Sequence, residues 1–130
     1  MKSAQKEVIC STKAPLPIGS YSQAVKVGDF IFISGQLPLE PQTGKIISDD
    51  ITEQTKRCME NLTEILNETG NTMENVVKTT IYLKEISDFA AVNKVYQTYF
   101  KSDFPARATL QVSALAGKAK VEIDAIAFCN

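Results

Sequence analysis

Apolar and polar side chains alternate along two segments in the last quarter of the chain. The first segment is 107–112 and the second is 120–127. Because a β-strand has a side-chain period of two, each segment predicts a strand with one apolar and one polar face. The linker 113–118 is short enough for an antiparallel hairpin. Aligning the apolar faces places Arg107 opposite Glu122, and a register shifted by two residues also satisfies the pattern.

Four further segments predict strands, and two of them form a hairpin. Residues 23–27 and 30–34 flank Gly28-Asp29, a pair that suits a two-residue turn. Residues 7–11 are a short candidate strand near the N-terminus. Val76–Leu83 is rich in β-branched residues, which are favoured in strands. Together with the two alternating segments, these supply the strands of one expected sheet.

Two segments have the spacing of helices. The first is expected from about Asp50 to Thr69, because Asp50 and Glu53 resemble a capping box and Gly70 is a suitable C-terminal stop. The second is expected to start at Ser87 as its N-cap and to run to about Lys101. The residues expected to pack in this second helix are Phe89, Val92, Tyr96, Tyr99 and Phe100.

The expected elements follow the order β-ββ-α-β-α-β-β. This order predicts an α+β fold with a single mixed sheet and two helices on one face. The other face of the sheet also carries apolar residues, namely Val76, Tyr82 and alternate residues of 30–33. Such a face needs a second cover, and self-association supplies it most simply.

Length and composition are those of an ordinary soluble globular protein. The 130 residues predict one domain over 1–130, with 44% hydrophobic and 22% charged residues. The net charge of -1 gives no basic footprint for nucleic acid. No segment resembles a signal peptide or approaches the roughly 20 apolar residues of a membrane span. We therefore expect a cytoplasmic protein that binds neither membranes nor nucleic acid.

The chain contains no histidine and three cysteines. The absence of histidine excludes Ser-His-Asp and Cys-His catalysis, His-ligated zinc and two-histidine ribonuclease chemistry. Cys10, Cys58 and Cys129 have no metal-binding spacing, and Cys58 falls on the apolar stripe of the first helix. We therefore expect neither a metal nor a cofactor. Any chemistry must use carboxylates, Arg, Lys, Tyr, hydroxyl groups, backbone groups and water.

The expected pairing of Arg107 with Glu122 can be interpreted in two ways. They could form an exposed cross-strand salt bridge, worth well under about 1 kcal/mol. Alternatively they could form a small anion site, because a guanidinium binds a carboxylate through two parallel hydrogen bonds. The glutamate would then hold water or move a proton on the bound molecule. The residue pattern alone leaves both interpretations open.

Six motifs, spread in order over nearly the whole chain, resemble the RidA (YjgF-type) family. They are Ile-Gly-Ser-Tyr-Ser-Gln-Ala at 18–24, Ser-Gly-Gln-Leu-Pro at 34–38, Val-Lys-Thr-Thr at 77–80, Asp-Phe-Ala-Ala-Val-Asn at 88–93, Phe-Pro-Ala-Arg at 104–107 and Val-Glu-Ile-Asp-Ala-Ile-Ala at 121–127. Six motifs at the family's spacing are far more specific than any one of them.

The resemblance implies a fold, an assembly and an activity. The fold would be the chorismate-mutase-like α+β fold, assembled as a homotrimer with three clefts between subunits. The activity would be hydrolysis of small reactive enamino and imino acids, such as 2-aminoacrylate, which pyridoxal-phosphate dehydratases release. The products would be a 2-oxo acid and ammonia.

The resemblance also implies the residues of the site. Arg107 matches the arginine that binds the substrate carboxylate, and Glu122 matches the glutamate that positions the attacking water. The residues expected to line the cleft are Tyr21, Ser34, Gly35 and Asn93.

Two positions depart from the family pattern. Ser20 stands where the family often has proline, which changes only the stiffness of the loop. Thr109 stands where many members carry cysteine, two residues after Arg107. On a strand Thr109 shares the face of Arg107, so its hydroxyl is expected to reach the same cleft. That hydroxyl cannot act as a thiolate would, and its role is limited to a hydrogen bond or to the shape of the pocket.

Two other functions stay open. One is a ribonuclease or translation inhibitor, a label that the family has carried, although the negative net charge and the absence of histidine argue against it. The other is a non-catalytic trimer that uses Arg107 to sense 2-oxo acids or related carboxylates. Sequence does not separate a sensor from an enzyme, because both need the same arginine.

Overall fold

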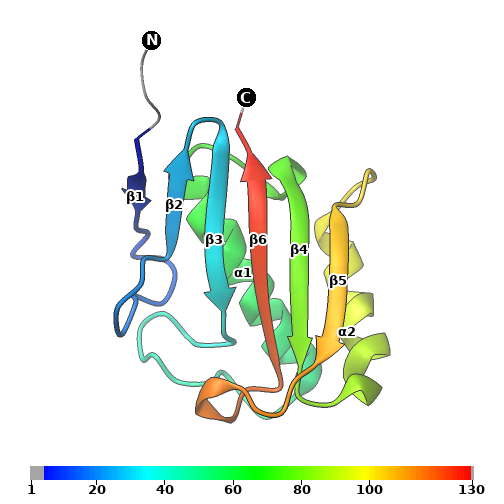
Figure 1. The fold of residues 1–130 in the computed structure, drawn as a ribbon. Helices are drawn as coiled ribbons and strands as arrows, with labels where there is room; N and C mark the ends of the chain where they lie inside the picture. The colour runs from blue at the N-terminus through cyan, green and yellow to red at the C-terminus, as the bar shows by residue number, and fades with distance from the viewer. Residues whose placement is uncertain (1–4, 130) are drawn as a thin grey trace.

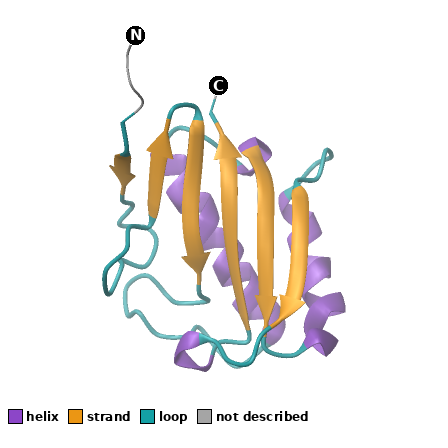
Figure 2. Cartoon of the chain, in the orientation of Figure 1, coloured by secondary structure: helices purple, strands orange, loops and turns teal. Residues whose placement is uncertain are grey.

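The computed structural model describes residues 5–129, which form a six-stranded sheet with both α-helices on one face (Figure 1, Figure 2). The elements are β1 (Glu7–Ile9), β2 (Ala24–Val27), β3 (Phe30–Gln36), α1 (Ile51–Glu68), β4 (Val76–Leu83), α2 (Phe89–Tyr96), β5 (Ala106–Gln111) and β6 (Val121–Phe128). The sheet is mixed, because β4 and β5 are parallel while the other pairs are antiparallel. The expected fold class is therefore confirmed.

The strand order β1-β2-β3-β6-β4-β5 contradicts the expected hairpin of the last two strands. β5 pairs with β4, and Arg107 lies opposite Thr79. β6 pairs with β3 and β4, and Glu122 lies opposite Tyr82. Because β4 separates β5 from β6, the prediction that Arg107 and Glu122 face each other across a hairpin is wrong.

The connection through α2 explains why β4 lies between the last two strands. Parallel strands need a crossover rather than a tight turn, and α2 is the crossover from β4 to β5. The segment after β5 then passes the end of β4 before it enters β6 (Figure 1). Backbone hydrogen bonds hold it there, since Val112 N–H donates to Leu83 O at 2.8 Å and Lys84 N–H donates to Lys120 O at 3.0 Å. A short linker thus need not join neighbouring strands.

The first hairpin and the first helix lie where the sequence predicts them. β2 and β3 are joined by Gly28-Asp29. α1 begins after Asp50, whose Oδ2 accepts a hydrogen bond from Glu53 N–H at 2.9 Å. The chain leaves the helix at Gly70, whose φ of +79° suits glycine.

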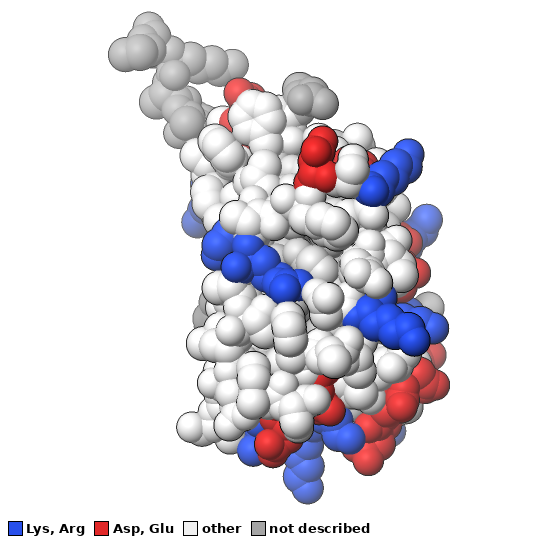
Figure 3. All heavy atoms as spheres, turned by 90° about the vertical axis from the view of Figure 1, so that its right-hand side faces the viewer, with Lys and Arg blue, Asp and Glu red and all other residues white. Residues whose placement is uncertain are grey.

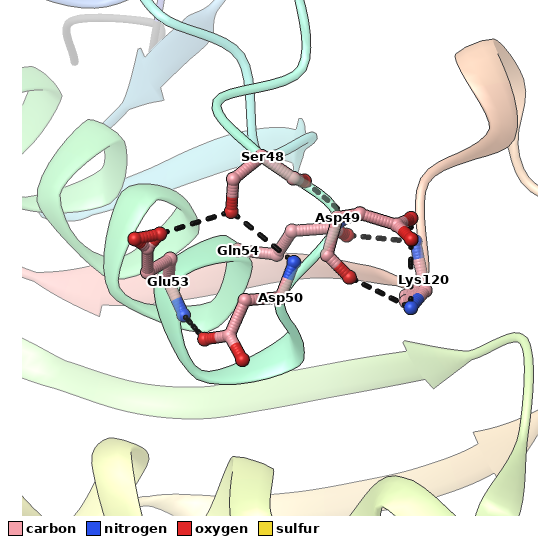
Figure 4. Close-up of polar contacts among 6 residues, drawn as sticks. All are labelled: Ser48, Asp49, Asp50, Glu53, Gln54 and Lys120. Atoms are coloured by element: carbon pink, nitrogen blue, oxygen red, sulfur yellow. Dashed lines mark hydrogen bonds and ion pairs between the residues drawn. The ribbon is translucent and has the colours of Figure 1, made fainter.

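Ser48 completes the cap of α1 and links it to the start of β6 (Figure 4). Asp50 N–H donates to Ser48 Oγ at 3.1 Å, and Ser48 Oγ donates to the Glu53 carboxylate at 3.0 Å. Ser48 thus satisfies the amide that Glu53 would bind in a capping box. The buried Gln54 donates to Ser48 O at 2.8 Å and accepts from Lys120 N–H at 2.9 Å. The cap of α1 therefore fixes the chain just before β6.

α2 is shorter than expected, and Ser87 does not cap it. Ile86–Asp88 forms a 3₁₀ turn, so Asp88 stands at the N-cap position, and its side chain makes no capping hydrogen bond. The α-helix gives way to a second 3₁₀ turn over Gln97–Tyr99, before the expected end at Lys101. Turns of this kind are frequent at helix ends, so the packing pattern resembles that of a longer helix.

The core lies between the sheet and the helices, and the opposite face of the sheet is open (Figure 1). This open face exposes Phe30, Phe32 and Phe128, which keep 42%, 45% and 40% of their surface accessible. The prediction of apolar residues on both faces is confirmed. No helix in the described part of the chain combines the length and apolarity needed to cross a bilayer.

Val76 is an exception to the expected open face. The pairing register with β6 shifts between Val76 and Lys78, which marks a β-bulge. The bulge turns Val76 into the core, where it is 5% exposed, and leaves Val77 43% exposed. Beyond the bulge the strand regains its period, so Tyr82 lies on the open face as expected.

Candidate active site

Arg107 is held on the helix-covered face, at the edge of the sheet. It lies opposite Thr79, a buried residue whose hydroxyl forms a 2.8 Å hydrogen bond with the hydroxyl of Tyr96 on α2. Arg107 Nη1 donates a 2.7 Å hydrogen bond to Asn93 Oδ1. Its Cζ lies 5.1 Å from the ring centroids of both Phe89 and Tyr96. One hydrogen bond and two cation–π contacts therefore hold the guanidinium.

A cavity of about 370 Å³ opens beside Arg107. It is lined by Asn93, Tyr96, Gln97, Phe104, Pro105 and Arg107. Arg107 is the one charged residue in this lining, so a single cation faces neutral walls. Figure 3 shows this side of the molecule, where basic groups stand apart on a broad uncharged surface. Such a cavity suits one small anion better than the closely spaced phosphates of a nucleic acid.

Thr109 follows Arg107 on the same face of β5, as the strand period predicts. Its hydroxyl oxygen is buried, and no group among residues 5–129 forms a hydrogen bond with it. A buried polar group without a partner typically costs about 1–3 kcal/mol. The Thr109 hydroxyl is therefore available to a bound ligand or to a second chain.

Glu122 lies on the opposite face of the sheet from Arg107. It alternates with Val121 and Ile123, which are buried in the core, so its side chain points to the open face. The carboxylate lies directly against Gly35, where an added Cβ would overlap Glu122 Oε2. Glycine is therefore needed at position 35 as long as the carboxylate keeps this place.

The surroundings of Glu122 raise the pKa of its carboxyl group. Burial of the half-buried carboxyl is the larger cause, and the negative charge of Asp124 is the smaller one. Asp124 is itself held by Thr80 N–H at 3.1 Å and by the Tyr82 hydroxyl at 3.0 Å. A carboxyl group with a raised pKa exchanges a proton closer to neutral pH than an ordinary glutamate does.

Tyr21, Ser34 and Gly35 lie together around a second cavity, next to Glu122. This cavity measures about 460 Å³. Its other lining residues are apolar: Leu16, Ile18, Leu37, Leu39 and Ala116. A β-bulge within 33–36 displaces Ser34 and Gly35 from regular pairing with β6. The bulge thereby opens the space beside Gly35 that the Glu122 carboxylate occupies.

The expected site residues thus fall into two groups, which we call the arginine site and the glutamate site. The arginine site consists of Asn93, Arg107 and Thr109, and the glutamate site consists of Tyr21, Ser34, Gly35 and Glu122. They lie on opposite faces of the sheet, and β4 separates their strands. Between residues 5 and 129, no cluster of three or more histidine, cysteine or carboxylate side chains is placed to hold a metal ion.

Three residues beside these sites are not identified by the sequence as part of them. The hydrophobic pattern predicts Phe89 and Tyr96 only as packing residues, whereas both contact Arg107. Phe89 and Tyr96 lie four and three residues from Asn93, so all three share one face of a helix. This spacing is the sequence signal that could have placed the two aromatic residues beside the site. Asp124 lies two residues after Glu122, so the strand period alone places it on the same face.

Comparison with protein families matches residues 11–129 to the family described as Endoribonuclease L-PSP. The chain belongs to this family. A RutC family protein of Pyrococcus abyssi is 53% identical to it, over 95% of this chain and 97% of the relative. The 2-iminobutanoate/2-iminopropanoate deaminase of Mus musculus is 48% identical, over 98% of this chain and 94% of the relative.

A solved structure extends the similarity to three dimensions. YyfA of Yersinia pestis, a protein of the conserved Rid family, superposes with a TM-score of 0.93 and 42% identity, over 95% of this chain and 99% of that chain. The resemblance to the RidA (YjgF-type) family is thereby confirmed. The sheet with two helices on one face is the chorismate-mutase-like fold of these proteins.

Proposed function

We propose that this protein hydrolyses reactive 2-imino and 2-enamino acids, such as 2-aminoacrylate, to 2-oxo acids and ammonia. The observation that carries the proposal is the arginine site, where one fixed guanidinium faces a neutral cavity of about 370 Å³. This geometry suits a single small carboxylate. The name of the mouse relative, 2-iminobutanoate/2-iminopropanoate deaminase, supports the same activity.

The complete active site would form between two copies of the chain. Arg107 lies on β5, which is the edge strand, whereas Glu122 lies on the open face. If the β5 edge of one copy packs against the open face of the next, the arginine site of one meets the glutamate site of the other. Three copies closed in a ring would contain three such sites, as the family resemblance implies.

The exposed phenylalanines of the open face support this assembly. Phe30, Phe32 and Phe128 are each at least 40% exposed in the isolated chain, and an interface would bury them. Light scattering should therefore give three times the mass of one chain. A stable monomer at micromolar concentration would contradict both the trimer and the shared site.

The residues have distinct roles in the proposed reaction. Arg107 binds the carboxylate of the imino acid and orients its electrophilic carbon. Glu122 of the neighbouring copy accepts a proton from water while the water oxygen bonds to that carbon. The nitrogen takes up the proton that Glu122 returns and the proton of the newly added hydroxyl group. The C–N bond then breaks, so the nitrogen leaves as ammonia and the hydroxyl oxygen becomes the carbonyl oxygen of the 2-oxo acid. One imine and one water thus give one 2-oxo acid and one ammonia.

A coupled assay tests the proposed activity. A serine or threonine dehydratase supplies the reactive intermediate, and the release of pyruvate or 2-oxobutyrate is recorded with and without this protein. Release should be faster with the wild-type protein, and Arg107→Ala should give only the spontaneous rate. Equal rates with and without wild-type protein would contradict catalysis.

The same assay, joined to a binding measurement, separates an enzyme from a carboxylate sensor. Both would bind 2-oxobutyrate through Arg107, and both would lose binding in Arg107→Ala. A sensor would leave the rate of release at its spontaneous value, whereas the proposed enzyme raises it.

A further inference from the structure

Three side chains of α2 converge on Arg107 from one face of the helix. Phe89, Asn93 and Tyr96 are spaced by four and three residues, so they lie one above another along the helix. The Arg107 Cζ is 5.1 Å from each ring centroid, and Nη1 is 2.7 Å from Asn93 Oδ1. We call Phe89, Asn93 and Tyr96 the arginine cradle.

The cradle is itself braced by the neighbouring strand. Tyr96 is 2% exposed, and its hydroxyl forms a 2.8 Å hydrogen bond with the hydroxyl of Thr79, which is fully buried. Thr79 is also the register partner of Arg107 on β4. Phe100 also packs against the Tyr96 ring, with the two ring centroids 5.0 Å apart. The ring that contacts Arg107 is therefore fixed by β4 and by the segment after α2.

Arginine needs such support at this position. Its side chain is long and rotamer-rich, and here it stands on an exposed edge strand. A carboxylate is bound best when the planar fork is held in one orientation before the ligand arrives. Asn93 occupies Nη1, and among the described residues no group accepts a hydrogen bond from Nε or Nη2. The Nε–Nη2 edge is thus left free for a bidentate partner.

We infer that Phe89 and Tyr96 are positioning residues for carboxylate recognition. With Asn93 they hold the Arg107 guanidinium in one orientation between two rings, so that its Nε–Nη2 edge binds the substrate carboxylate. This inference rests on the proposed function, because it explains how the Arg107 guanidinium is oriented to bind the carboxylate of the proposed substrate. Both rings act through the arginine cation, whose Cζ lies 5.1 Å from each ring centroid.

Calorimetric binding of 2-oxobutyrate tests the role of the rings. Phe89→Leu and Tyr96→Leu each remove one ring. The Kd of each variant should be roughly two- to fivefold higher than that of wild type, the equivalent of about 0.5–1 kcal/mol. Tyr96→Phe keeps the ring and loses the hydroxyl that braces it on Thr79, so its Kd should lie between those of wild type and Tyr96→Leu. Tyr99→Leu is the matched control, because Tyr99 packs against the core and does not line the cavity beside Arg107.

The control distinguishes positioning from general destabilisation. Both Phe89→Leu and Tyr99→Leu should lower the melting temperature, but only Phe89→Leu should raise the Kd. If Phe89→Leu and Tyr96→Leu bind 2-oxobutyrate as wild type does while Arg107→Ala does not bind it, the cradle is structural only and this inference is wrong. If Arg107→Ala also binds as wild type does, the proposed function itself fails.

A measurement on the wild-type protein tests the same geometry without any variant. Protons of the Arg107 side chain that lie over two aromatic faces should resonate upfield of their usual position in NMR spectra. Ordinary shifts for these protons would overturn the cradle, whatever the variants do.

Discussion

The arginine site and the glutamate site are built in opposite ways. Arg107 is fixed by side chains, namely by the hydrogen bond that it donates to Asn93 and by two aromatic rings. Glu122 is shaped by the backbone, because its carboxylate fills the space that a Cβ at position 35 would occupy. Arg107 is exposed on an edge strand, whereas Glu122 is half-buried on a central one.

This difference matches the two tasks of the proposed reaction. A binding group must stay charged and keep its orientation, which hydrogen bonds and stacked rings provide without burial. A group that transfers protons needs a pKa nearer neutral, which burial and the charge of Asp124 provide for Glu122. Neither site contains both the guanidinium and the carboxylate, so each copy of the chain would need a second copy to complete an active site.

The largest effect is expected at Arg107. Arg107→Ala should lower kcat/KM for 2-aminoacrylate by roughly a hundredfold or more, because a preorganised electrostatic contact is lost. Arg107→Lys should also be severe, since an ammonium cannot form the bidentate fork. The coupled dehydratase assay measures both variants, and light scattering checks that they assemble. Near-full activity of Arg107→Ala would show that the arginine site is not the substrate site.

Glu122→Gln should be the next most damaging change. The amide keeps the size of the side chain but cannot accept a proton, so kcat should fall by roughly a hundredfold. Binding of 2-oxobutyrate should change little, because the carboxylate is bound at the other site. A loss of binding with unchanged kcat would reverse the roles assigned to the two sites.

Thr109→Val should have a smaller effect. Its buried hydroxyl has no partner among the described residues, so its contribution is at most one hydrogen bond to a ligand or a second chain. The fold should be retained, and activity should fall by the amount that corresponds to one neutral hydrogen bond, about 0.5–1.5 kcal/mol. The comparison with Glu122→Gln in one assay is decisive: an inactive valine variant beside an active glutamine variant would contradict catalysis through Glu122.

The smallest effect near neutral pH is expected for Asp124→Asn. Glu122 acts as a base, so activity is present above its pKa and is lost as the pH falls through that value. Asp124 helps to raise the pKa of Glu122, and removing its charge should move the acid limb of kcat/KM to lower pH. Asparagine can still accept from Thr80 N–H, which preserves the local geometry. An acid limb that stays in place would show that Asp124 does not influence the catalytic group.

Local signals explain which parts of the fold could be predicted from the sequence. The turn at Gly28-Asp29 and the cap at Asp50 act over a few residues, and both elements lie as expected. The pairing of β5 with β4 depends on a crossover through α2, and alternation alone does not reveal the partner of a strand. The face of the sheet to which Val76 points depends on a β-bulge. The bulge shifts the alternation of the strand, and no residue pattern in the sequence indicates it.

The candidate site shows the same limit. The family resemblance names Arg107 and Glu122, but an intrachain pairing between them would require β5 beside β6. The role of Phe89 depends on how α2 lies over β5, which no periodicity specifies. The sequence could therefore name the candidate residues, whereas their division between two faces of the sheet could not be predicted.

Mixing two inactive variants tests the shared site most directly. Arg107→Ala and Glu122→Gln are unfolded together in equal amounts, refolded as mixed trimers, and assayed beside wild type treated in the same way. Each site would take its arginine from one copy and its glutamate from the next, so random mixing should restore about a quarter of the wild-type activity. The double variant Arg107→Ala/Glu122→Gln, mixed with either single variant, should restore none. If the mixture of single variants is as inactive as each alone while refolded wild type is active, the two sites do not combine between chains.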